Sequence, residues 1–491
     1  MTRAPRFPFV AAALLVVATS AIAWFPRIVG VSAPHALAWF FAFGVVAAAA
    51  FARIARFAWR DDAEPAATAT PNAADPRMAT HHGGLALITF ALLLRAPALV
   101  AEPWLSDDLW RYLWEGKVAR AGFSPYESAP DAPELAPLRD DVHARVAHPE
   151  VSTVYPPLAQ LLFRGLPESE RLWKVVVLAA DVALLLLLRR ALVKRGLPAR
   201  RLLLYAAHPL VALEGANSGH VDVIAWLPMV AGLVALEGRD VASRARRFAA
   251  GVATGLAALI KPQALAPAVA FVRRRDGVAL LGLVATIALG FAPYIKEGAS
   301  LFTGTARYAH DWEFNGLAYP PAVRLAEIVK EELGKLPNQP LELWRVRELA
   351  YPIVPNQLGR KLATLLFLGL AFVLARRLAA RPVALAFALL VAFLATSPVV
   401  YPWYVAWLVP FVPLLPARAT RAALLLTFTS LAAYAVRIET LAHGGWFEPP
   451  WLCAVTWLPP CLLGAYDLWS VPASSSTGST AASRSYSAGT L

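Results

Sequence analysis

Long apolar runs, separated by short polar or basic stretches, occupy most of this 491-residue chain. Hydrophobic residues make up 58% of the sequence and charged residues 16%, whereas an ordinary soluble domain has about 45–50% and about 25%. This balance excludes a soluble, a disordered or a fibrous protein. Because a helix needs about 20 apolar residues to cross a bilayer, it predicts an all-α polytopic membrane protein with about 12 transmembrane helices. The candidate spans are residues 8–26, 36–57, 84–101, 172–190, 200–215, 222–237, 277–295, 362–379, 382–396, 402–416, 421–437 and 450–468.

Basic residues between these spans predict the orientation of the chain, because cytoplasmic loops carry an excess of Lys and Arg. If the N-terminus is cytoplasmic, all the basic clusters fall on the cytoplasmic side, at residues 53–60, 189–201, 239–247, 273–275, 376–381 and 418–421. The short loops on the opposite side contain no Lys or Arg, at residues 31–35, 215–221, 397–402 and 443–449. We therefore expect an inner-membrane (plasma-membrane) protein with both termini in the cytoplasm. The net charge of +13 then belongs to the cytoplasmic loops and does not indicate nucleic-acid binding.

The segment from Phe248 to Val272 does not fit a single span. Lys261-Pro262-Gln263 interrupts it, and both of its ends are strongly basic. If both ends are cytoplasmic, the segment enters the membrane and returns as a broken or re-entrant helical hairpin with its tip near Lys261. Non-helical backbone at that depth is tolerated where it lines a polar cavity. The alternative is one kinked span from which Lys261 reaches toward the membrane surface.

Two long segments, 102–171 and 296–360, then lie outside the membrane as large extracytoplasmic loops. Segments of this length are usually functional or disordered, and their many aromatic residues favour surface helices over disorder. Residues 61–83 and 470–491 have the composition of disordered chain. The sequence therefore predicts an N-terminal two-helix membrane hairpin (1–60), a disordered cytoplasmic linker (61–83), a main transmembrane domain (84–469) and a disordered cytoplasmic tail (470–491).

The first outside segment opens with the acidic and aromatic run SDDLWRYLWEG at residues 106–116. Asp107 has Arg111 as an ion-pair partner four residues later, whereas Asp108 has Tyr112 at that spacing and is the freer carboxylate. A free carboxylate at a membrane face can act as a general base. The alternative is a pair of capping acids in the first turn of a solvated helix.

Aromatic residues in the same segment predict how it lies. Trp110, Leu113 and Trp114 recur at helical spacing, which predicts a helix in the membrane interface with its aromatic side chains in the lipid. Further along, Tyr155 precedes Pro156-Pro157, a pair that presets the start of a helix. The simplest interpretation of Tyr155 and these prolines is a rigid turn packed on the bundle.

Ionisable residues also occur within the spans or at their outer ends. Asp181 lies in the middle of one span, and Glu214, Asn217, His220 and Asp222 cluster where the spans 200–215 and 222–237 meet. Ionisable residues in a membrane are costly and usually face a cavity or a pathway. His220 and Asp222 do not belong to a compact set of metal ligands, so no metal site is predicted. The alternative for residues 217–222 is a short polar turn of capping residues.

Two aromatic blocks complete the set of candidate site residues. The second outside segment contains Trp312, Glu313 and Asn315, and the turn Ser397–Tyr404 contains the aromatic residues Tyr401, Trp403 and Tyr404. The mixture in the second outside segment suits a sugar ring, which has an apolar face and a hydroxyl rim, and it also suits a well-packed loop. The alternative for the turn Ser397–Tyr404 is an aromatic membrane anchor. Since every cluster falls on the same side in this topology, we expect one extracytoplasmic site near the interface.

Taken in order, these blocks resemble a known family. The run at 106–116, with Ser124-Pro125-Tyr126, resembles the first periplasmic loop of bacterial GT-C superfamily glycosyltransferases, and above all family 87 and the polyprenol-phosphate-mannose-dependent mannosyltransferases. The resemblance covers roughly residues 84–470. The further similar blocks, in the same order, are Tyr155–Gln160, Asn217–Asp222, Lys261–Gln263, Trp312–Gly316 and Ser397–Tyr404.

The resemblance implies a GT-C-like catalytic domain and an inverting hexosyltransferase. Such an enzyme moves a hexose, typically mannose, from a polyprenyl-phosphate donor to a lipid or glycan acceptor at the extracytoplasmic face. Asp108 would be the base with Asp107 assisting, and Lys261 and His220 would bind the donor phosphate, so that no cofactor or divalent metal is required. Some relatives carry His in place of Tyr401, so a His-dependent role is not carried over. Sugar and acceptor contacts are expected from Tyr155, Asn217, Asp222, Gln263, Trp312, Glu313, Asn315, Tyr401, Trp403 and Tyr404.

Other functions fit parts of the sequence. A secondary transporter also combines many spans, a broken helix and intramembrane acids, but it does not need two long aromatic outside segments, and the sequence shows no internal repeat. A GT-C ligase or polymerase with a diphosphate-linked donor is a second alternative. A non-catalytic scaffold for envelope assembly is a third.

Overall fold

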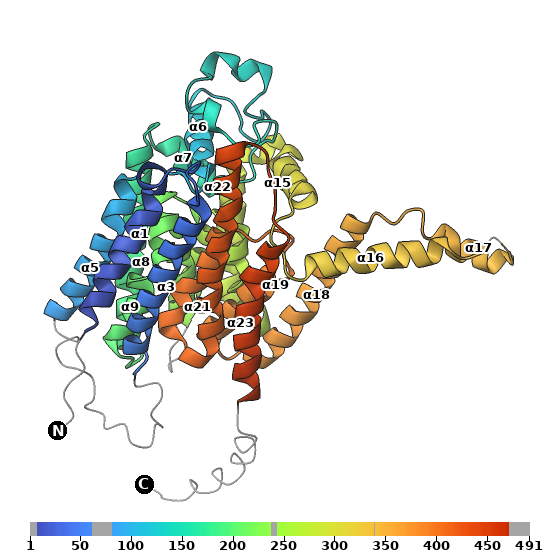
Figure 1. Ribbon diagram of the computed structural model, residues 1–491. Coiled ribbons are helices and arrows are strands. Elements are labelled where there is room, and N and C mark those ends of the chain that lie inside the picture. Colours follow the sequence, from blue (N-terminus) through green and yellow to red (C-terminus); the bar gives the residue numbers. More distant parts are fainter. Residues whose placement is uncertain (1–6, 61–80, 237–242, 338, 471–491) are drawn as a thin grey trace, which may run out of the picture.

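The computed structural model describes residues 7–60, 81–236, 243–337 and 339–470. The regular elements in these residues are helices without any β-strand, and only isolated bridges join Phe314 and Asn315 to Val399. The prediction of an all-α chain is confirmed, and the apolar helices identify a membrane protein (Figure 1). The number of about 12 spans stays a prediction. Within the described ranges, the helices long and apolar enough to cross a membrane are Ala36–Ala58, Gly277–Glu297, Pro355–Leu378 and Ala417–His443.

The helices follow one another with short connections over most of the chain. The first part contains α1 (Phe9–Ala23), α2 (Phe25–Ile28), α3 (Ala36–Ala58), α5 (His81–Val100), α6 (Asp108–Arg120), the 3-10 turns η2 (Pro133–Leu138) and η3 (His143–Arg145), α7 (Pro157–Gly165), α8 (Glu170–Lys194), η4 (Ala199–Leu202), α9 (Leu203–Ala206), α10 (Pro209–Val211), the π-helical η5 (Ala212–Asn217) and α11 (Asp222–Leu236). The second part contains α12 (Arg244–Ala258), η6 (Pro262–Leu265), α13 (Ala268–Arg273), α14 (Gly277–Phe291), η7 (Ala292–Glu297), α15 (Ser300–Asp311), α16 (Tyr319–Gly334), α17 (Leu341–Glu348), α18 (Pro355–Leu378), α19 (Pro382–Thr396), α20 (Pro402–Val405), η8 (Ala406–Leu414), α21 (Ala417–Thr429), η9 (Ser430–Ala433), α22 (Tyr434–His443) and α23 (Trp451–Trp469). The predicted span at 200–215 is thus built from four short pieces.

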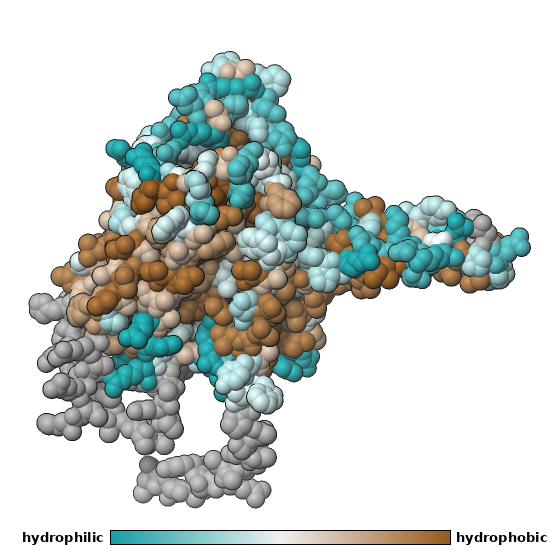
Figure 2. Space-filling view, in the orientation of Figure 1, coloured by the Kyte–Doolittle hydropathy of each residue, from teal (hydrophilic) through white to brown (hydrophobic). Residues whose placement is uncertain are grey.

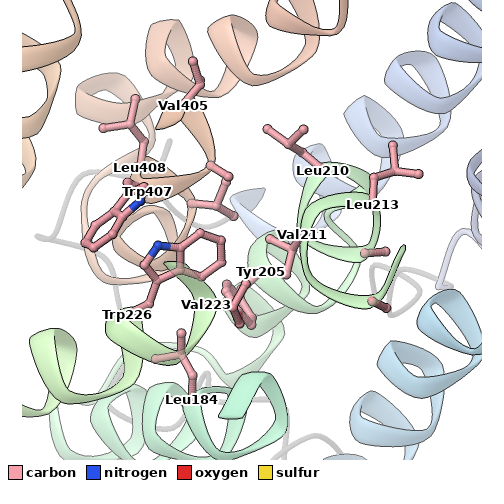
Figure 3. Packing of buried hydrophobic residues seen from close by; sticks show 14 of the residues in the cluster. Leu184, Tyr205, Leu210, Val211, Leu213, Val223, Trp226, Val405, Trp407 and Leu408 are labelled. Carbon is pink, nitrogen blue, oxygen red and sulfur yellow. The ribbon is translucent and has the colours of Figure 1, made fainter. Parts of the chain in front are cut away.

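The core of the bundle lies where α8, α9, α11 and η8 meet. Trp226 and Trp407 are buried there and cross edge to face, with ring centroids 6.2 Å apart (Figure 3). Beside them, Asp181 forms an ion pair with Arg95 and accepts a hydrogen bond from the Tyr205 hydroxyl at 2.5 Å. A buried charge is costly unless it is paired. Asp181 is therefore held by the protein, in contrast to the predicted cavity or pathway.

Arginine-rich loops that are far apart in sequence contact one another. Arg195 donates a hydrogen bond to the carbonyl of Leu414 at 3.1 Å, next to the basic cluster at the start of α21. Arg274 donates to the carbonyl of Ala379 at 3.1 Å, between α18 and α19. Loops that contact each other in this way lie at the same end of the bundle, as the predicted topology requires.

The segment 248–272 is a broken hairpin. Helix α12 ends at Ala258, Lys261 is extended with φ −144° and ψ 124°, and the chain continues through η6 and the short α13. Arg247 near the start of α12 lies 3.4 Å from Asp276, which follows α13, so both ends of the segment lie together. A Cβ on Gly251 would lie 1.9 Å from the Ala279 carbonyl oxygen, so only glycine permits this close packing of α12 against α14. The geometry agrees with the predicted hairpin and not with a single kinked span.

The first outside segment folds over one end of the bundle. Within it, the chain that follows α6 covers that helix. Trp110, Leu113 and Trp114 are only 8%, 6% and 1% exposed. Trp114 packs against Leu135 and Val146, which come from the chain beyond α6. The expectation that this stripe faces lipid is therefore wrong, because residues that follow α6 cover it. Helical spacing identified a buried face without showing whether lipid or protein buries it.

The second outside segment forms an arm that projects from the bundle. Helices α16 and α17 extend away from the other helices (Figure 1), and α18 packs against the root of α16, where Gly359 meets Val323. Leu325, Ile328 and Leu349 are exposed on this arm, and Figure 2 shows apolar side chains along its lower side. The segment is therefore helical, as its aromatic content predicts.

The predicted disordered linker (61–83) and tail (470–491) lie mainly outside the residues that the structure describes. Residues 61–80, from the predicted linker, and 471–491, from the predicted tail, lie outside the described ranges. Helix α5 begins at His81, so the last residues assigned to the linker belong to a helix. Inside the described part, α1 and α3 pack into the same apolar cluster as α5 and α8.

Candidate active site

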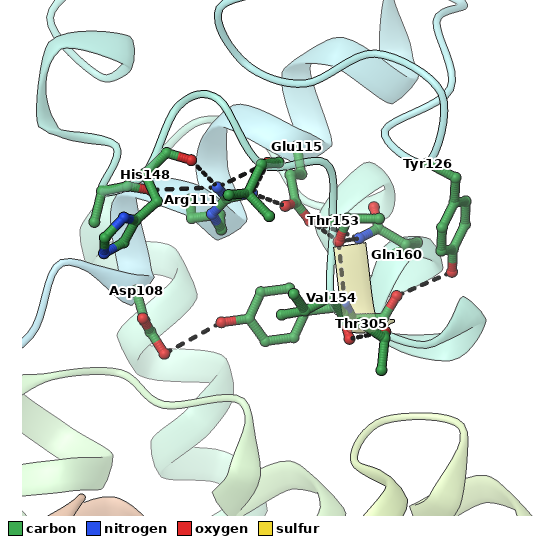
Figure 4. Close-up of polar contacts among 12 residues, drawn as sticks. Asp108, Arg111, Glu115, Tyr126, His148, Thr153, Val154, Gln160 and Thr305 are labelled. Carbon is green, nitrogen blue, oxygen red and sulfur yellow. Dashed lines mark hydrogen bonds and ion pairs between the residues drawn. The ribbon is translucent and has the colours of Figure 1, made fainter. Parts of the chain in front are cut away.

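Asp108 is the first residue of α6, and its carboxylate lies at the open end of a polar network (Figure 4). The hydroxyls of Tyr155 and Tyr112 donate to its Oδ2 atom at 3.2 Å and 3.4 Å. Burial and the nearby Asp108 charge raise the pKa of both phenols well above 10. They therefore stay protonated at neutral pH and act as donors. The Asp108 side chain itself is 29% exposed, so it is supported from one side and open on another.

Tyr155 is fixed by the turn before α7, as its sequence context predicts. Its backbone N–H donates to Thr153 Oγ1 at 3.1 Å, and its carbonyl accepts from the Tyr126 hydroxyl at 3.0 Å. The first turn of α7 contacts the tip of the broken hairpin, because the Leu158 N–H donates to the Leu259 carbonyl at 3.0 Å. The motif that carries Tyr155 is thus joined directly to the turn that carries Lys261.

Lys261 lies at the tip of the hairpin and is 9% exposed. Its Nζ atom is 3.3 Å from Asp222 Oδ2, and it lies over the Tyr155 and Tyr404 rings at 5.0 Å and 5.9 Å from their centroids. Asp222 is fully buried and accepts a hydrogen bond from the Trp407 indole at 2.7 Å. The acidic partner of Lys261 is therefore Asp222.

His220 occupies the turn between η5 and α11 and links the acids of the site. Its Nδ1 atom is 3.6 Å from Asp108 Oδ2, and its Nε2 atom is 3.3 Å from Glu214 Oε2. Burial lowers the pKa of His220, but the Glu214, Asp108 and Asp222 carboxylates together raise it above 6.5. The protonated imidazolium is therefore favoured beyond the ordinary range of histidine.

An aromatic wall covers the same region. The His220 ring stacks on Trp403 at 4.5 Å, and Trp403 stacks on Tyr401 at 4.3 Å with an interplanar angle of 5°. Tyr404 shares a hydrogen bond of 2.6 Å with the Tyr308 hydroxyl. Backbone bonds between Phe314 and residues 398–400 hold the second outside segment against this turn. Three predicted blocks thus converge on Asp108.

The predicted ion pair between Asp107 and Arg111 is not formed. Arg437 binds both Asp107 carboxylate oxygens, at 2.7 Å and 2.5 Å. Arg111 instead binds Glu115 at 3.0 Å and the Val151 carbonyl at 3.1 Å. Helical spacing permits either Asp107 or Glu115 as the partner of Arg111, and the fold of residues 147–151 decides between them. No local signal identifies Arg437, because it lies in α22, 330 residues away.

Glu115 is a buried acid that the sequence did not single out. Its Oε2 atom accepts hydrogen bonds from Gln160 at 2.6 Å and from Thr153 at 2.7 Å. Burial raises its pKa, although Arg111 and these donors act in the opposite direction. Glu115 therefore ties α6 to the Tyr155 turn and supports the position of Asp108 through the backbone.

Several predicted contact residues already have protein partners. Asn217 donates to the Glu102 carbonyl at 3.1 Å, and Asn315 donates to Thr456 at 3.2 Å. Glu313 binds Arg360 at 3.0 Å at the root of the arm. These side chains hold segments together, and their contact with a sugar stays a prediction.

Trp312 and Gln263 are the other predicted contact residues beside the site. The Trp312 ring stacks on Tyr308 with centroids 5.1 Å apart, so it belongs to the same aromatic surface as Tyr404. Gln263 lies two residues after Lys261 on η6 and is partly exposed. Over the described ranges, no three His, Cys, Asp or Glu side chains are placed to hold a metal ion.

Fold and site together define a class. The chain is a helical membrane protein whose candidate site contains a carboxylate, a lysine and a histidine beside an aromatic wall. In an integral-membrane transferase such groups can act as a base and as cations that bind a leaving group. The family model for alpha-(1->6)-mannopyranosyltransferase, N-terminal domain, matches residues 6–274, and that for glycosyltransferase family 87 matches residues 153–402. Each match spans just over half of the chain, which therefore belongs to the GT-C-like mannosyltransferase family described by these two models.

Membership of this family makes the protein a glycosyltransferase that takes a sugar donor and a glycan or lipid acceptor. Curated proteins give no match to the chain, and neither do solved structures. The resemblance found in the sequence motifs is thus confirmed at the level of the family.

Proposed function

We propose that the protein transfers mannose from a polyprenyl-phosphate donor to a hydroxyl of a lipid or glycan acceptor. Transfer takes place at the extracytoplasmic face and inverts the anomeric carbon. The main support is the setting of Asp108, which two phenols orient while its carboxylate stays partly open. Asp107 is saturated by Arg437 and is less suited to accept a proton.

The proposed reaction is a single displacement. The bond between the anomeric carbon and the donor phosphate oxygen breaks, and polyprenyl phosphate leaves with the electron pair. The acceptor oxygen forms the new bond from the opposite face, and its proton passes to Asp108. A positioned carboxylate base of this kind contributes about 10²–10⁴-fold to a rate. Tyr155 and Tyr112 orient the carboxylate toward the acceptor.

Lys261 and His220 are proposed to bind the donor phosphate. Both are cationic side chains: His220 lies 3.6 Å from Asp108, and Lys261 lies over the Tyr155 ring, whose hydroxyl binds Asp108. Neither can move far, because Asp222 holds Lys261 and Glu214 holds His220. Fixed positive charge aimed at a developing negative charge lowers the barrier to departure of the phosphate. Because side-chain cations supply this charge, the proposal requires no divalent metal. Tyr401, Trp403 and Tyr404 are then proposed to line the sugar site.

The proposal is tested directly with radiolabelled polyprenyl-phosphate mannose supplied to membranes that contain the protein. We expect label in an extractable mannosylated lipid or glycan. Label that accumulates inside vesicles without a new product would indicate transport and contradict the proposal. A parallel assay with polyprenyl-diphosphate sugar separates the ligase or polymerase alternative, for which that donor alone would support transfer.

The raised pKa of His220 predicts a pH dependence of the donor reaction. The imidazolium is present below that pKa and is lost as the pH rises through it, so kcat/KM for the donor should fall as the pH rises, at a higher pH than an ordinary histidine would give. In the His220→Gln variant, kcat/KM for the donor should be lower than in the wild type at acidic pH. It should also lack the fall with rising pH that the wild type shows. The measurement is a pH–rate profile of both proteins between about pH 6 and pH 9.

His443→Gln is the matched control for this prediction. His443 is exposed at the end of α22 and pairs with Glu439 at 3.6 Å, away from the acids around His220. Its variant should keep the wild-type profile. An unchanged fall with rising pH in His220→Gln would show that another group titrates and would remove His220 from phosphate binding.

A further inference from the structure

A cavity with both polar and apolar side chains in its wall opens beside Asp107. It has a volume of about 600 Å³ and lies between the α1–α2 corner, the start of α6, η3 and α22. Lys261, His220 and Asp108 are not among the residues that line it. The lining residues used below are Trp24, Arg27, Glu102, Asp107, Trp110, Arg145 and Arg437.

We propose that this cavity binds a neutral saccharide of the acceptor. The inference rests on the proposed function and adds the place and the chemistry of acceptor recognition. Its volume falls within the range of about 300–1,000 Å³ that is typical of small-molecule sites. Three aspects of the cavity carry the argument, namely its position, its planar lining and its charge balance.

The cavity lies close to the proposed base, because one of two consecutive carboxylates belongs to its wall. Asp107 and Asp108 are consecutive, so their Cα atoms are about 3.8 Å apart. Asp107 belongs to the cavity wall, where Arg437 holds it through both oxygens. Asp108 contacts Tyr155 on the other side. A saccharide in the cavity would therefore contact the residue that directly precedes the proposed base.

The lining suits a pyranose ring, whose apolar face can pack on the partly exposed Trp24 indole and whose hydroxyls pair with guanidinium and carboxylate groups. The Arg145 guanidinium lies 4.5 Å over the Trp110 ring, and that of Arg27 lies 5.4 Å over Trp24. The Trp24 indole N–H donates to the Pro97 carbonyl at 3.0 Å, which fixes this ring. Binding to fixed side chains has a lower entropic cost.

The pairing of most charges in the cavity wall suits a neutral ligand, because two of the three arginines are already bound to carboxylates. Arg145 pairs with Glu102 at 3.1 Å, and Arg437 pairs with Asp107. Two of the three guanidiniums are therefore neutralised by carboxylates that also line the cavity. These carboxylates repel a phosphate but accept hydrogen bonds from hydroxyl groups. Arg27 supplies further donors at the rim, where its side chain is exposed.

The test measures binding and transfer separately. The binding probe is an octyl glycoside of α-(1→6)-mannotriose, titrated without donor into the purified full-length chain and followed by ligand-observed NMR. Arg27→Ala/Arg145→Ala should weaken binding of the trisaccharide by about tenfold or more, because hydrogen bonds from two charged groups are lost. In transfer assays the same variant should raise the acceptor KM to a similar extent while leaving the donor KM near wild type.

Arg324→Ala is the matched control, since Arg324 is an exposed arginine on α16 that pairs with Glu327 outside the cavity. It should bind the trisaccharide as the wild type does, and thermal unfolding checks that all variants are folded. Unchanged trisaccharide binding in Arg27→Ala/Arg145→Ala would overturn the inference. Tighter binding of mannose 6-phosphate than of the neutral sugar at this cavity would also overturn it. Binding without any transfer by the wild type would instead count against the proposed function.

Discussion

Replacing Asp108 with asparagine is expected to lower the rate of mannosyl transfer by about 10²–10⁴-fold. Asparagine has nearly the same shape and can still accept the hydrogen bonds of Tyr155 and Tyr112, but it cannot take a proton from the acceptor. The loss should appear in kcat with little change in the donor KM, because Asp108 is proposed to act on the acceptor. Initial rates with radiolabelled donor, together with thermal unfolding of both proteins, measure the effect.

Asp107→Asn is the matched control, because it makes the same chemical change one residue away. Arg437 holds Asp107 through two charge-assisted bonds, so this variant loses support for the start of α6 without losing the proposed base. We expect a smaller loss of kcat than for Asp108→Asn and a lower Tm. Near-normal transfer by Asp108→Asn would refute the assignment of the base, and a greater loss in Asp107→Asn would move the assignment to its neighbour.

Replacing Lys261 with methionine is expected to lower kcat/KM for the donor by about 10²–10³-fold, the range found when one donor to a developing oxyanion is removed. Methionine fills a similar volume but supplies no charge for the phosphate. It also leaves the buried Asp222 without its cation, which disfavours an anionic ligand nearby. Donor-dependence curves at saturating acceptor measure this effect.

The double variant Lys261→Met/Asp222→Asn separates these two causes. It removes the unpaired buried charge, so it should recover stability relative to the single variant. It should not recover wild-type donor binding, since the cation is still absent. Full recovery of donor kcat/KM would mean that Lys261 only neutralises Asp222. An unchanged donor dependence in Lys261→Met would remove it from the site altogether.

The positions of proline, charged residues and helical repeats in the sequence predicted those features that depend on residues close together in the chain. The proline beside Lys261 and the basic residues at both ends of its segment predicted the broken hairpin, because backbone chemistry and charge act locally. Spacing also predicted the contact between Tyr112 and Asp108, which are one helical turn apart. The polar turn with His220 and Asp222 was identified because charged residues are rare in apolar surroundings.

Pairings between distant segments could not be predicted in the same way. Arg437 reaches Asp107 from α22, and Arg95 reaches Asp181 from another helix, so their partners depend on packing rather than on spacing. The apolar stripe with Trp110 was placed in lipid, because an apolar face looks the same whether lipid or protein covers it. Resemblance to the family supplied the reaction, which no pattern of charge or hydropathy could name.

The broken hairpin also sets how far Lys261 lies from the basic end of the bundle. Helix α12 has 15 residues and therefore rises about 22 Å from its basic end before the turn that carries Lys261. The hydrocarbon layer is about 30 Å thick, so the predicted topology would place the lysine just beneath the opposite head groups. A lipid-linked sugar can present its phosphate at this depth while its prenyl chain stays dissolved among the acyl chains. Under the proposed function, the donor would then react without its prenyl chain leaving the membrane.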